Sequence, residues 1–263
     1  MPELPDVETF KRYLDATSLH QRINGVDVES AYVLKGVSAR ELAHRLKGRC
    51  FESSRRHGKH LFVRADGELW LRLHFGMTGS LQYFKRGEQA SKHTRVLFVF
   101  ASTHCLAFED QRKFGEVGLV KDVDKFLKKR ALGPDALDLS LSLFRQIFEK
   151  HRGAVKAILL NQKLIAGIGN IYADEILFRA RLHPAIEISR VGDKALTKLF
   201  RATHYILRKA IAAKADVNQM PKSWLLPHRG KHGKCPRCGR ELKSSRIGGR
   251  TAWFCPHCQR RTA

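Results

Sequence analysis

The chain has 263 residues and combines 49 Lys and Arg with 25 Asp and Glu, which gives a formal net charge of +24 at pH 7 and a sequence pI of about 10.2. With 43% hydrophobic residues it can bury one large core or two smaller ones, which excludes a disordered basic tail. Such a charge favours a polyanionic partner, with nucleic acid as the first candidate. A membrane-surface protein is disfavoured, because basic residues extend from Lys11 to Arg261 and no apolar run is long enough to span a bilayer.

The first residues suggest a nucleophile. Removal of Met1 would leave Pro2 as a secondary amine with Glu3 beside it. Such an amine can attack a sugar aldehyde and form an iminium with a fixed positive charge, and Glu3 could serve as its acid or base. The alternative is a plain helix start, because Pro5 is typical of a first turn and an apolar stripe follows at Val7, Phe10 and Leu14. No apolar signal region follows a basic start, so we expect an intracellular, cytoplasmic protein that works beside the genome.

Short apolar runs with strand character continue from about residue 18 to 120 and are separated by glycine-bearing turns. Residues 61–63, 69–73 and 96–100 are clear examples, and they favour a β-sandwich. Residues 121–130 are highly charged and precede the turn sequence Leu-Gly-Pro-Asp at 132–135. We interpret this charged run as a solvated connector at a domain hinge. From about 140 to 215 the apolar spacing becomes helical and predicts four helices with short links.

A glycine loop lies within the helical region at residues 167–173, Gly-Ile-Gly-Asn-Ile-Tyr-Ala. It resembles a dinucleotide-binding fingerprint, but residues 154–162 before it read as helix rather than strand, which argues against a nicotinamide site. We interpret the loop as a helix-turn-helix whose backbone amides and Asn170 side chain approach a phosphate. The alternative is that Gly167 and Gly169 only allow close helix packing.

Four of the six cysteines form two Cys-x-x-Cys pairs, separated by sixteen residues: Cys235, Cys238, Cys255 and Cys258. This spacing is typical of one tetrahedral, structural zinc ion, and four thiolates leave no open position for a catalytic water. Disulfides are the alternative, and His232 or His257 could replace a thiolate. Cys50 and Cys105 stand alone and are expected to be ordinary small hydrophobes. Residues 241–246 and 250–254 read as two strands around the turn at 247–249, with Arg250 near the tip of the hairpin.

Several motifs in one order together resemble the bacterial formamidopyrimidine-DNA glycosylases, within the wider family that includes endonuclease VIII. They comprise residues 2–8 (Pro-Glu-Leu-Pro-Asp-Val-Glu), 55–61 (Arg-Arg-His-Gly-Lys-His-Leu), 74–81 (His-Phe-Gly-Met-Thr-Gly-Ser-Leu), 110–115 (Asp-Gln-Arg-Lys-Phe-Gly), 167–173 and the cysteine pairs. The resemblance implies an α+β multidomain protein, with an N-terminal helix and β-sandwich over 1–130, a helix–two-turn–helix domain over 131–222 and a zinc-finger hairpin over 228–263.

The resemblance also implies roles for individual residues. Pro2 would be the Schiff-base nucleophile, Glu3 the acid that helps open the sugar, and Lys59 a cleft lysine that contacts phosphate near the lesion. Further DNA-contacting residues would be Met77, His93, Arg112, Lys113, Phe114, Lys156, Asn170 and Arg250. Among them, Met77, Arg112 and Phe114 would fill the hole left when a damaged nucleotide leaves the stack, although Met77 and Phe114 read as core residues without the resemblance. Lys113 stands where many relatives have arginine, so it keeps the charge but loses the bidentate fork.

The implied activity is removal of oxidised bases from double-stranded DNA followed by β,δ-elimination at the abasic site. We expect a monomer that needs neither a nucleotide cofactor nor a membrane. Residues 213–234, only 22 in number, replace the long loop that caps 8-oxoguanine in relatives, so we expect formamidopyrimidines to be better substrates than 8-oxoguanine. Trp224 in this segment would contact the base or anchor the short loop. Two other classes share the charge: a non-catalytic zinc-containing DNA-binding protein, which has no use for a processed Pro2, and a nucleic-acid chaperone, which would tolerate loss of Met77, Arg112 and Phe114.

Overall fold

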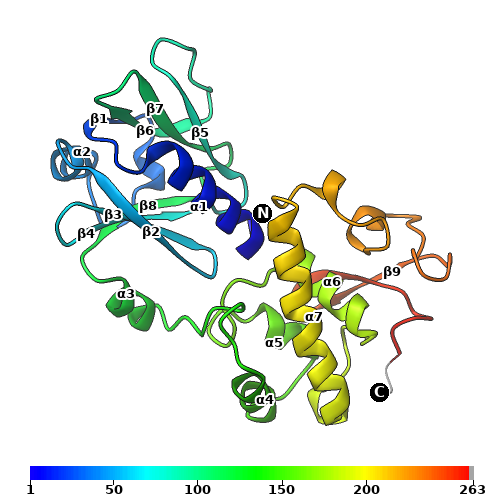
Figure 1. Cartoon of the computed structure of the whole chain (residues 1–263). Coiled ribbons are helices and arrows are strands. Elements are labelled where there is room, and N and C mark those ends of the chain that lie inside the picture. The colour runs from blue at the N-terminus through cyan, green and yellow to red at the C-terminus, as the bar shows by residue number, and fades with distance from the viewer. Residues whose placement is uncertain (261–263) are drawn as a thin grey trace. The chain divides into compact units, whose positions relative to one another are not determined.

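The computed structural model describes residues 1–260, which divide into two compact units, one of residues 1–2 and 6–131 and one of residues 3–5 and 132 onward. In the first unit, two four-stranded antiparallel sheets have the strand orders β1-β6-β7-β5 and β2-β3-β4-β8 (Figure 1). Their strands are β1 (Ile23–Val28), β2 (Phe51–His57), β3 (His60–Ala65), β4 (Leu69–His74), β5 (Gly79–Lys85), β6 (Thr94–Phe100), β7 (His104–Asp110) and β8 (Glu116–Val120).

A single apolar core joins these two sheets. Phe51 of β2 lies 6.0 Å from Phe98 of β6, between ring centroids, although the two strands belong to different sheets. Strand β6 strictly alternates buried and half-buried residues, as the period of two requires when one face is covered. The helix α1 (Leu4–Ser18) contributes Val7 and Leu14 to this core, and α2 (Ala39–Leu46) contributes Leu42. The predicted β-sandwich is therefore confirmed.

The charged run at residues 121–130 is a helix, α3 (Val123–Lys129), rather than the solvated connector expected from its composition. Asp122 caps the helix by accepting a hydrogen bond from the Lys125 backbone N–H. The apolar residues of this run fall on one face, so Val123 is buried and Phe126 packs edge-on against Phe62. The amphipathic spacing, and not the number of charges, decides the structure.

The second unit contains four longer helices and a hairpin: α4 (Leu141–Glu149), α5 (Val155–Leu160), α6 (Asn170–Ala180), α7 (Asp193–Ala212), β9 (Lys243–Ile247) and β10 (Arg250–Phe254). The four helices and the hairpin match the prediction. Apolar faces of all four helices form one core around α6, which is buried along most of its length. Short 3-10 turns in this unit occupy Ile188–Arg190, Val217–Gln219 and Leu226–His228, and one in the first unit occupies Ala31–Val33.

The segment between α7 and the hairpin packs onto this helical core. Trp224 is 3% exposed, and Met220 and Leu225 are also buried. Of the two roles considered for Trp224, the structure shows the hydrophobic anchor. Among residues 1–260, no helix has both the length and the apolar character needed to cross a bilayer.

Candidate functional site

The carboxylate of Glu3 is completely buried at the start of α6. Its Oε2 atom accepts hydrogen bonds from the backbone N–H groups of Gly169 (2.8 Å) and Tyr172 (3.2 Å), and its Oε1 atom accepts one from Ile171 (2.8 Å). The first turn of a helix offers such unpaired N–H groups, and its dipole favours a negative charge there. All three contacts suit the oxygen atoms of a carboxylate, which only accept hydrogen bonds.

Glu3 also explains the glycine loop. A Cβ atom built on Gly169 would collide with the Glu3 carboxyl group, and Gly167 has a φ of +111°, a region that side chains disfavour. The loop connects α5 to α6, so it is not a strand-to-helix dinucleotide motif. We expected its backbone amides to approach a phosphate, and this expectation is corrected: the amides bind the chain's own carboxylate.

Pro2 is the residue before this fixed carboxylate. Leu4, on the other side of Glu3, donates a backbone hydrogen bond to the Gly167 carbonyl over 3.0 Å. Pro2 is half-buried and Met1 is exposed. Removal of Met1 would therefore leave an amine on the residue that directly precedes the buried Glu3.

Lys59 lies in the turn between β2 and β3, next to two enclosed histidines. The rings of His60 and His74 lie 4.8 Å apart, between centroids. Burial lowers the pKa of His60 to about 2, and burial, opposed by Glu116, lowers the pKa of His74 to about 4. The positive charge of Lys59 contributes to the shift of His74. Both rings are therefore neutral at neutral pH, and Lys59 provides the charge at this turn.

Met77, Arg112 and Phe114 lie on two loops of the first unit. Met77 is 38% exposed and Phe114 is 55% exposed, which excludes the interpretation of either as a core residue. The Arg112 guanidinium carbon lies 4.9 Å from the Phe114 ring centroid, a cation–π arrangement. Lys113, between them, adopts a left-handed backbone conformation with a φ of 56°. The three predicted wedge residues thus form an exposed group.

Asp110 holds these two loops together and was not predicted from the sequence. Its buried carboxylate accepts hydrogen bonds from the Thr78 hydroxyl, from the Arg112 backbone N–H (3.2 Å) and from the Gly115 backbone N–H (2.6 Å). Its own backbone N–H donates to the His93 carbonyl over 2.9 Å. The position was visible in the 110–115 motif, but only the structure shows that the side chain points inward.

Two predicted phosphate-contacting residues occupy the ends of elements in the second unit. Asn170 is the first residue of α6, and its buried Oδ1 atom has no hydrogen-bond partner among the described residues. Arg250 is exposed at the hairpin tip, paired across the turn with Ile247. His93, in contrast, belongs to the first unit and is half-buried.

Lys156 does not face solvent, and the expectation of a direct phosphate contact is corrected. It is fully buried, and its Nζ atom donates to Asp174 Oδ1 over 2.6 Å and to the Thr251 carbonyl over 3.1 Å. Asp174 also accepts from Arg229 (2.9 Å) and from the Trp253 backbone N–H (3.0 Å). Burial lowers the pKa of Lys156 and raises that of Asp174, and the attraction within the pair opposes both shifts. This network fastens β10 to α5 and α6.

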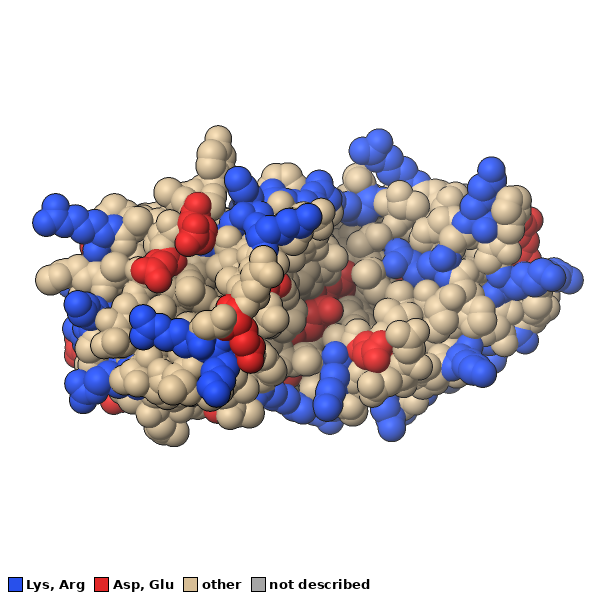
Figure 2. Space-filling view, turned by 90° about the horizontal axis from the view of Figure 1, so that it is seen from above, with Lys and Arg blue, Asp and Glu red and all other residues tan. Residues whose placement is uncertain are grey.

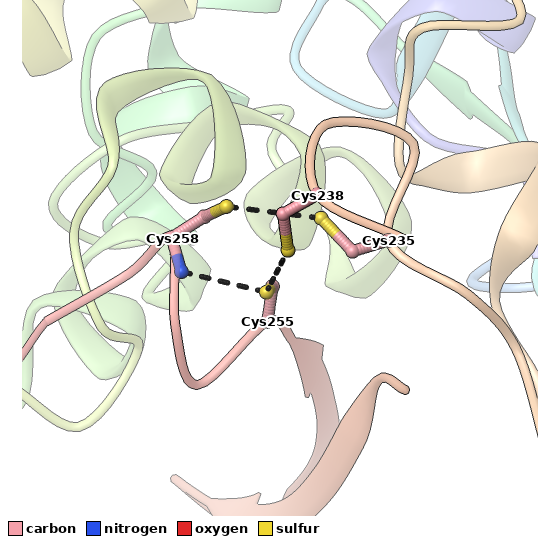
Figure 3. A group of neighbouring side chains, drawn as sticks. All are labelled: Cys235, Cys238, Cys255 and Cys258. Atoms are coloured by element: carbon pink, nitrogen blue, oxygen red, sulfur yellow. Dashed lines mark hydrogen bonds between the residues drawn. The ribbon is translucent and has the colours of Figure 1, made fainter. Parts of the chain in front are cut away.

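The four paired cysteines converge in the second unit, with all four sulfur atoms within 4.8 Å of one another (Figure 3). The Sγ atoms of Cys235 and Cys258 are 3.9 Å apart, and those of Cys238 and Cys255 are 3.6 Å apart. Four thiolates at about 2.3 Å from a zinc ion lie roughly 3.8 Å from one another in a tetrahedron, so the donor set fits zinc. Among residues 1–260, the group of side chains that could hold a metal consists of these four cysteines and includes neither His232 nor His257.

Family models match three consecutive parts of the chain. The formamidopyrimidine-DNA glycosylase N-terminal domain matches residues 1–117, the helix–two-turn–helix domain of the same enzymes matches 132–221, and the zinc finger found in these glycosylases and in isoleucyl-tRNA synthetases matches 233–261. A β-sandwich, this helical domain and a four-cysteine hairpin, in this order, define a class of DNA glycosylases of base-excision repair.

Whole-chain relatives specify the family. The chain is 34% identical to the formamidopyrimidine-DNA glycosylase of Carboxydothermus hydrogenoformans, covering 99% of this chain and 100% of that protein, and equally identical to that of Listeria innocua, with 99% and 100% covered. A crystal structure of the Lactococcus lactis enzyme, bound non-covalently to DNA containing an AP site, superposes with a TM-score of 0.90 at 32% identity and covers 98% of this chain and 99% of that chain. The chain belongs to the formamidopyrimidine-DNA glycosylase family, whose members have glycosylase and AP lyase activity.

Proposed function

We propose that this chain binds damaged double-stranded DNA, removes an oxidised base with the Pro2 amine as nucleophile, and cleaves the strand at the resulting site. The observation that carries the proposal is the buried carboxylate of Glu3, held by three backbone N–H groups of the α6 turn and bonded in sequence to Pro2. A carboxylate fixed on the residue after Pro2 would stabilise a cationic intermediate on Pro2, and it would need no rearrangement to do so.

Glu3 acts first as a base and then as an acid. The Pro2 nitrogen attacks the sugar carbon that bears the base, and the glycosidic bond breaks, so that the base leaves with the electron pair and takes a proton from water. The amine, now positively charged, transfers its own proton to the Glu3 carboxylate. Glu3 then gives this proton to the ring oxygen, which opens the sugar and leaves an iminium on Pro2. The iminium acidifies the neighbouring carbon, so the 3′ phosphate and then the 5′ phosphate leave by elimination.

The remaining predicted residues position the DNA. Lys59 binds a backbone phosphate near the lesion, and Asn170 and Arg250 bind further phosphates. His93 and Lys113 provide additional contacts. Met77, Arg112 and Phe114 occupy the space left by the extruded nucleotide, which offsets part of the few kcal/mol that unstacking costs. Zinc, held by four thiolates, supports the hairpin that carries Arg250, and no reaction step passes through it.

We also propose that the chain has three functional domains. Residues 1–130 supply the nucleophile and the wedge residues, residues 131–222 supply the phosphate contact of Asn170, and residues 228–263 supply the phosphate contact of Arg250. The protein acts as a monomer without a nucleotide cofactor. Its substrate is genomic DNA, which supports a cytoplasmic location.

Reductive trapping tests the proposal. Borohydride should link the protein covalently to a duplex with an abasic site only after Met1 is removed, as checked by intact mass. The matched control is the same protein with Met1 retained, whose Pro2 nitrogen is an amide and cannot attack. Pro2→Gly should trap more weakly, because its imine must be protonated before it withdraws electrons. Equal trapping with Met1 retained would show that another amine is responsible.

The segment between α7 and the hairpin supports a lesion preference. The second unit buries the side chains of Met220, Trp224 and Leu225, so they are unavailable to close over a purine. We expect formamidopyrimidines, hydantoins and abasic sites to be processed faster than 8-oxoguanine. Excision rates of 8-oxoguanine and a hydantoin, each opposite cytosine, measure this preference, and equal rates would contradict it.

A further inference from the structure

A second concentration of positive charge lies at the other end of the elements that carry Asn170 and Arg250. Three adjoining hollows in the second unit have volumes of about 520, 720 and 460 Å³. The first shares Arg201 and Tyr205 with the second, and Arg181 and Arg237 with the third. We call their cationic lining the outer basic tract, made of Arg179, Arg181, Lys198, Arg201, Arg208, Lys209, Arg237 and Arg260.

Among residues 1–260, no Asp or Glu lines these three hollows. Within residues 1–260, the salt bridges that the structure shows involve none of the eight tract cations. Burial lowers the pKa of Lys198, and the positive charges of Arg181 and Arg237 add to this effect. These cations therefore repel one another in the free protein, and a bound anion would relieve the repulsion.

Local structural roles explain only part of the tract. Arg179 and Arg181 lie at the C-terminus of α6, where the helix dipole favours cations, and Arg237 lies beside the zinc-binding thiolates. Lys198 and Arg201 lie in the middle of α7, where neither reason applies. Arg181 also adopts a left-handed conformation with a φ of 63°, a position for which helix ends usually select glycine.

The tract is separate from the proposed substrate contacts. Asn170 and Arg179 stand at opposite ends of α6, about 14 Å apart along its axis at 1.5 Å per residue. The strand β10 separates the two regions in the same way. Arg250 lies at the hairpin tip, at one end of β10, and the cysteine pair Cys255 and Cys258 follows the other end, beside Arg237 and Arg260. Figure 2 shows that Lys and Arg side chains also occur widely on the face drawn there, so charge alone does not define the tract.

We propose that the outer basic tract binds the phosphodiester backbone of a second DNA segment. Guanidinium groups bind phosphate through paired N–H donors, and six of the eight cations are arginines. The cations are distributed over three adjoining hollows. This distribution suits a polymer with regularly spaced charges better than one small anion. The Arg179 guanidinium also stacks on the Tyr205 ring at 3.6 Å, which holds its fork in place.

The experiment counts duplexes bound per protein, by analytical ultracentrifugation with a short undamaged duplex. The unmodified protein should bind a second duplex. The double variant Lys198→Glu, Arg201→Glu should weaken that second event by about tenfold or more while leaving the first duplex bound. The control, Lys150→Glu with Arg190→Glu, makes the same change in net charge at exposed positions outside the tract and should retain the second duplex.

Failure of the unmodified protein to bind a second duplex, or equal weakening in both double variants, would overturn the proposal. Competition distinguishes the kind of anion. Displacement of the second duplex by polyglutamate as readily as by unlabelled duplex, at equal charge concentration, would assign the tract to an acidic protein. Displacement by inorganic tripolyphosphate at lower charge concentration than duplex would assign it to a free polyphosphate. Because binding of undamaged duplex is measured, the result does not depend on the chemistry of Pro2.

Discussion

Gly169 shows how a missing side chain can determine the chemistry of a site. It caps α6, and the space that a Cβ atom would need is filled by the carboxyl group of Glu3. The requirement is steric, because Gly169 does not have a positive φ. The close approach of backbone and carboxylate therefore depends on this one residue.

We predict that Gly169→Ala displaces Glu3 and lowers the rates of base excision and trapping by about a hundredfold, similar to the loss of one oxyanion donor. Gly192→Ala is the matched control, because Gly192 caps α7 and has open space around its Cβ position. Its cost should be limited to stability, less than about 1 kcal/mol. Single-turnover excision kinetics measure the first effect, and similar rates in the two variants would show that Glu3 is not needed at this position.

At the scale of elements, α6 organises the second unit through three carboxylates. Its N-terminal amides bind Glu3, Asp174 binds the hairpin, and Glu175 accepts a hydrogen bond from the Leu226 backbone N–H over 2.8 Å. Burial raises the pKa of Glu175 to about 7, although the Leu226 and Leu225 N–H groups oppose the shift. The helix thus connects the site, the zinc hairpin and the segment after α7.

The raised pKa of Glu175 predicts a pH dependence of stability. Above about pH 4.5 the unfolded chain loses this proton, whereas the folded chain keeps it until about pH 7, so the unfolded state binds fewer protons in this window. The free energy of unfolding should then fall with rising pH, by up to about 1.4 kcal/mol per pH unit from this group. Urea unfolding of the unmodified protein and of Glu175→Gln, between about pH 5 and 7, isolates the contribution. Parallel curves for the two proteins would contradict it.

The hairpin should depend on its metal. We predict one zinc ion per chain and a loss of both zinc and DNA affinity on chelation, because ligand binding and local folding are coupled in such small sites. Cys238→Ser should reproduce this loss. Cys50→Ser is the control, since Cys50 lies outside the cysteine cluster, and it should keep the metal. Elemental analysis with DNA titration decides the matter, and tight DNA binding by zinc-free protein would contradict the prediction.

Sequence periodicity was sufficient for the sandwich, the four helices and the hairpin, because each buries one regular face. It failed for α3, where charged residues outnumber the few apolar ones that pack. For the candidate site, the order of the motifs was enough to choose candidate residues. It did not predict which of them are buried or which groups they bind. The sequence favours a phosphate contact for Lys156 and gives no separate role to Asp110, whereas both side chains are buried, because a sequence does not show which side of a loop or helix is enclosed.

At the scale of the whole molecule, the net charge of +24 predicts strongly salt-dependent DNA binding. The logarithm of the association constant should fall linearly with the logarithm of salt concentration, with a slope of about −0.9 for each neutralised phosphate. Arg250→Ala should reduce the magnitude of this slope by about one. Arg190→Ala, an exposed residue outside the proposed contacts, should leave it unchanged. A flat response would contradict phosphate binding by Lys59, Asn170 and Arg250.

The enclosed carboxylate of Glu3 has a practical consequence for preparing the protein. The Glu3 carboxylate is held at α6 by the backbone N–H groups of Gly169, Ile171 and Tyr172, so we expect the same fold before and after Met1 is removed. A purification tag fused ahead of Pro2 should therefore give well-folded, DNA-retaining material that is chemically inert. Such a preparation would serve as an inactive control in repair assays. A tag at the C-terminus is the appropriate choice when catalytic activity is to be measured.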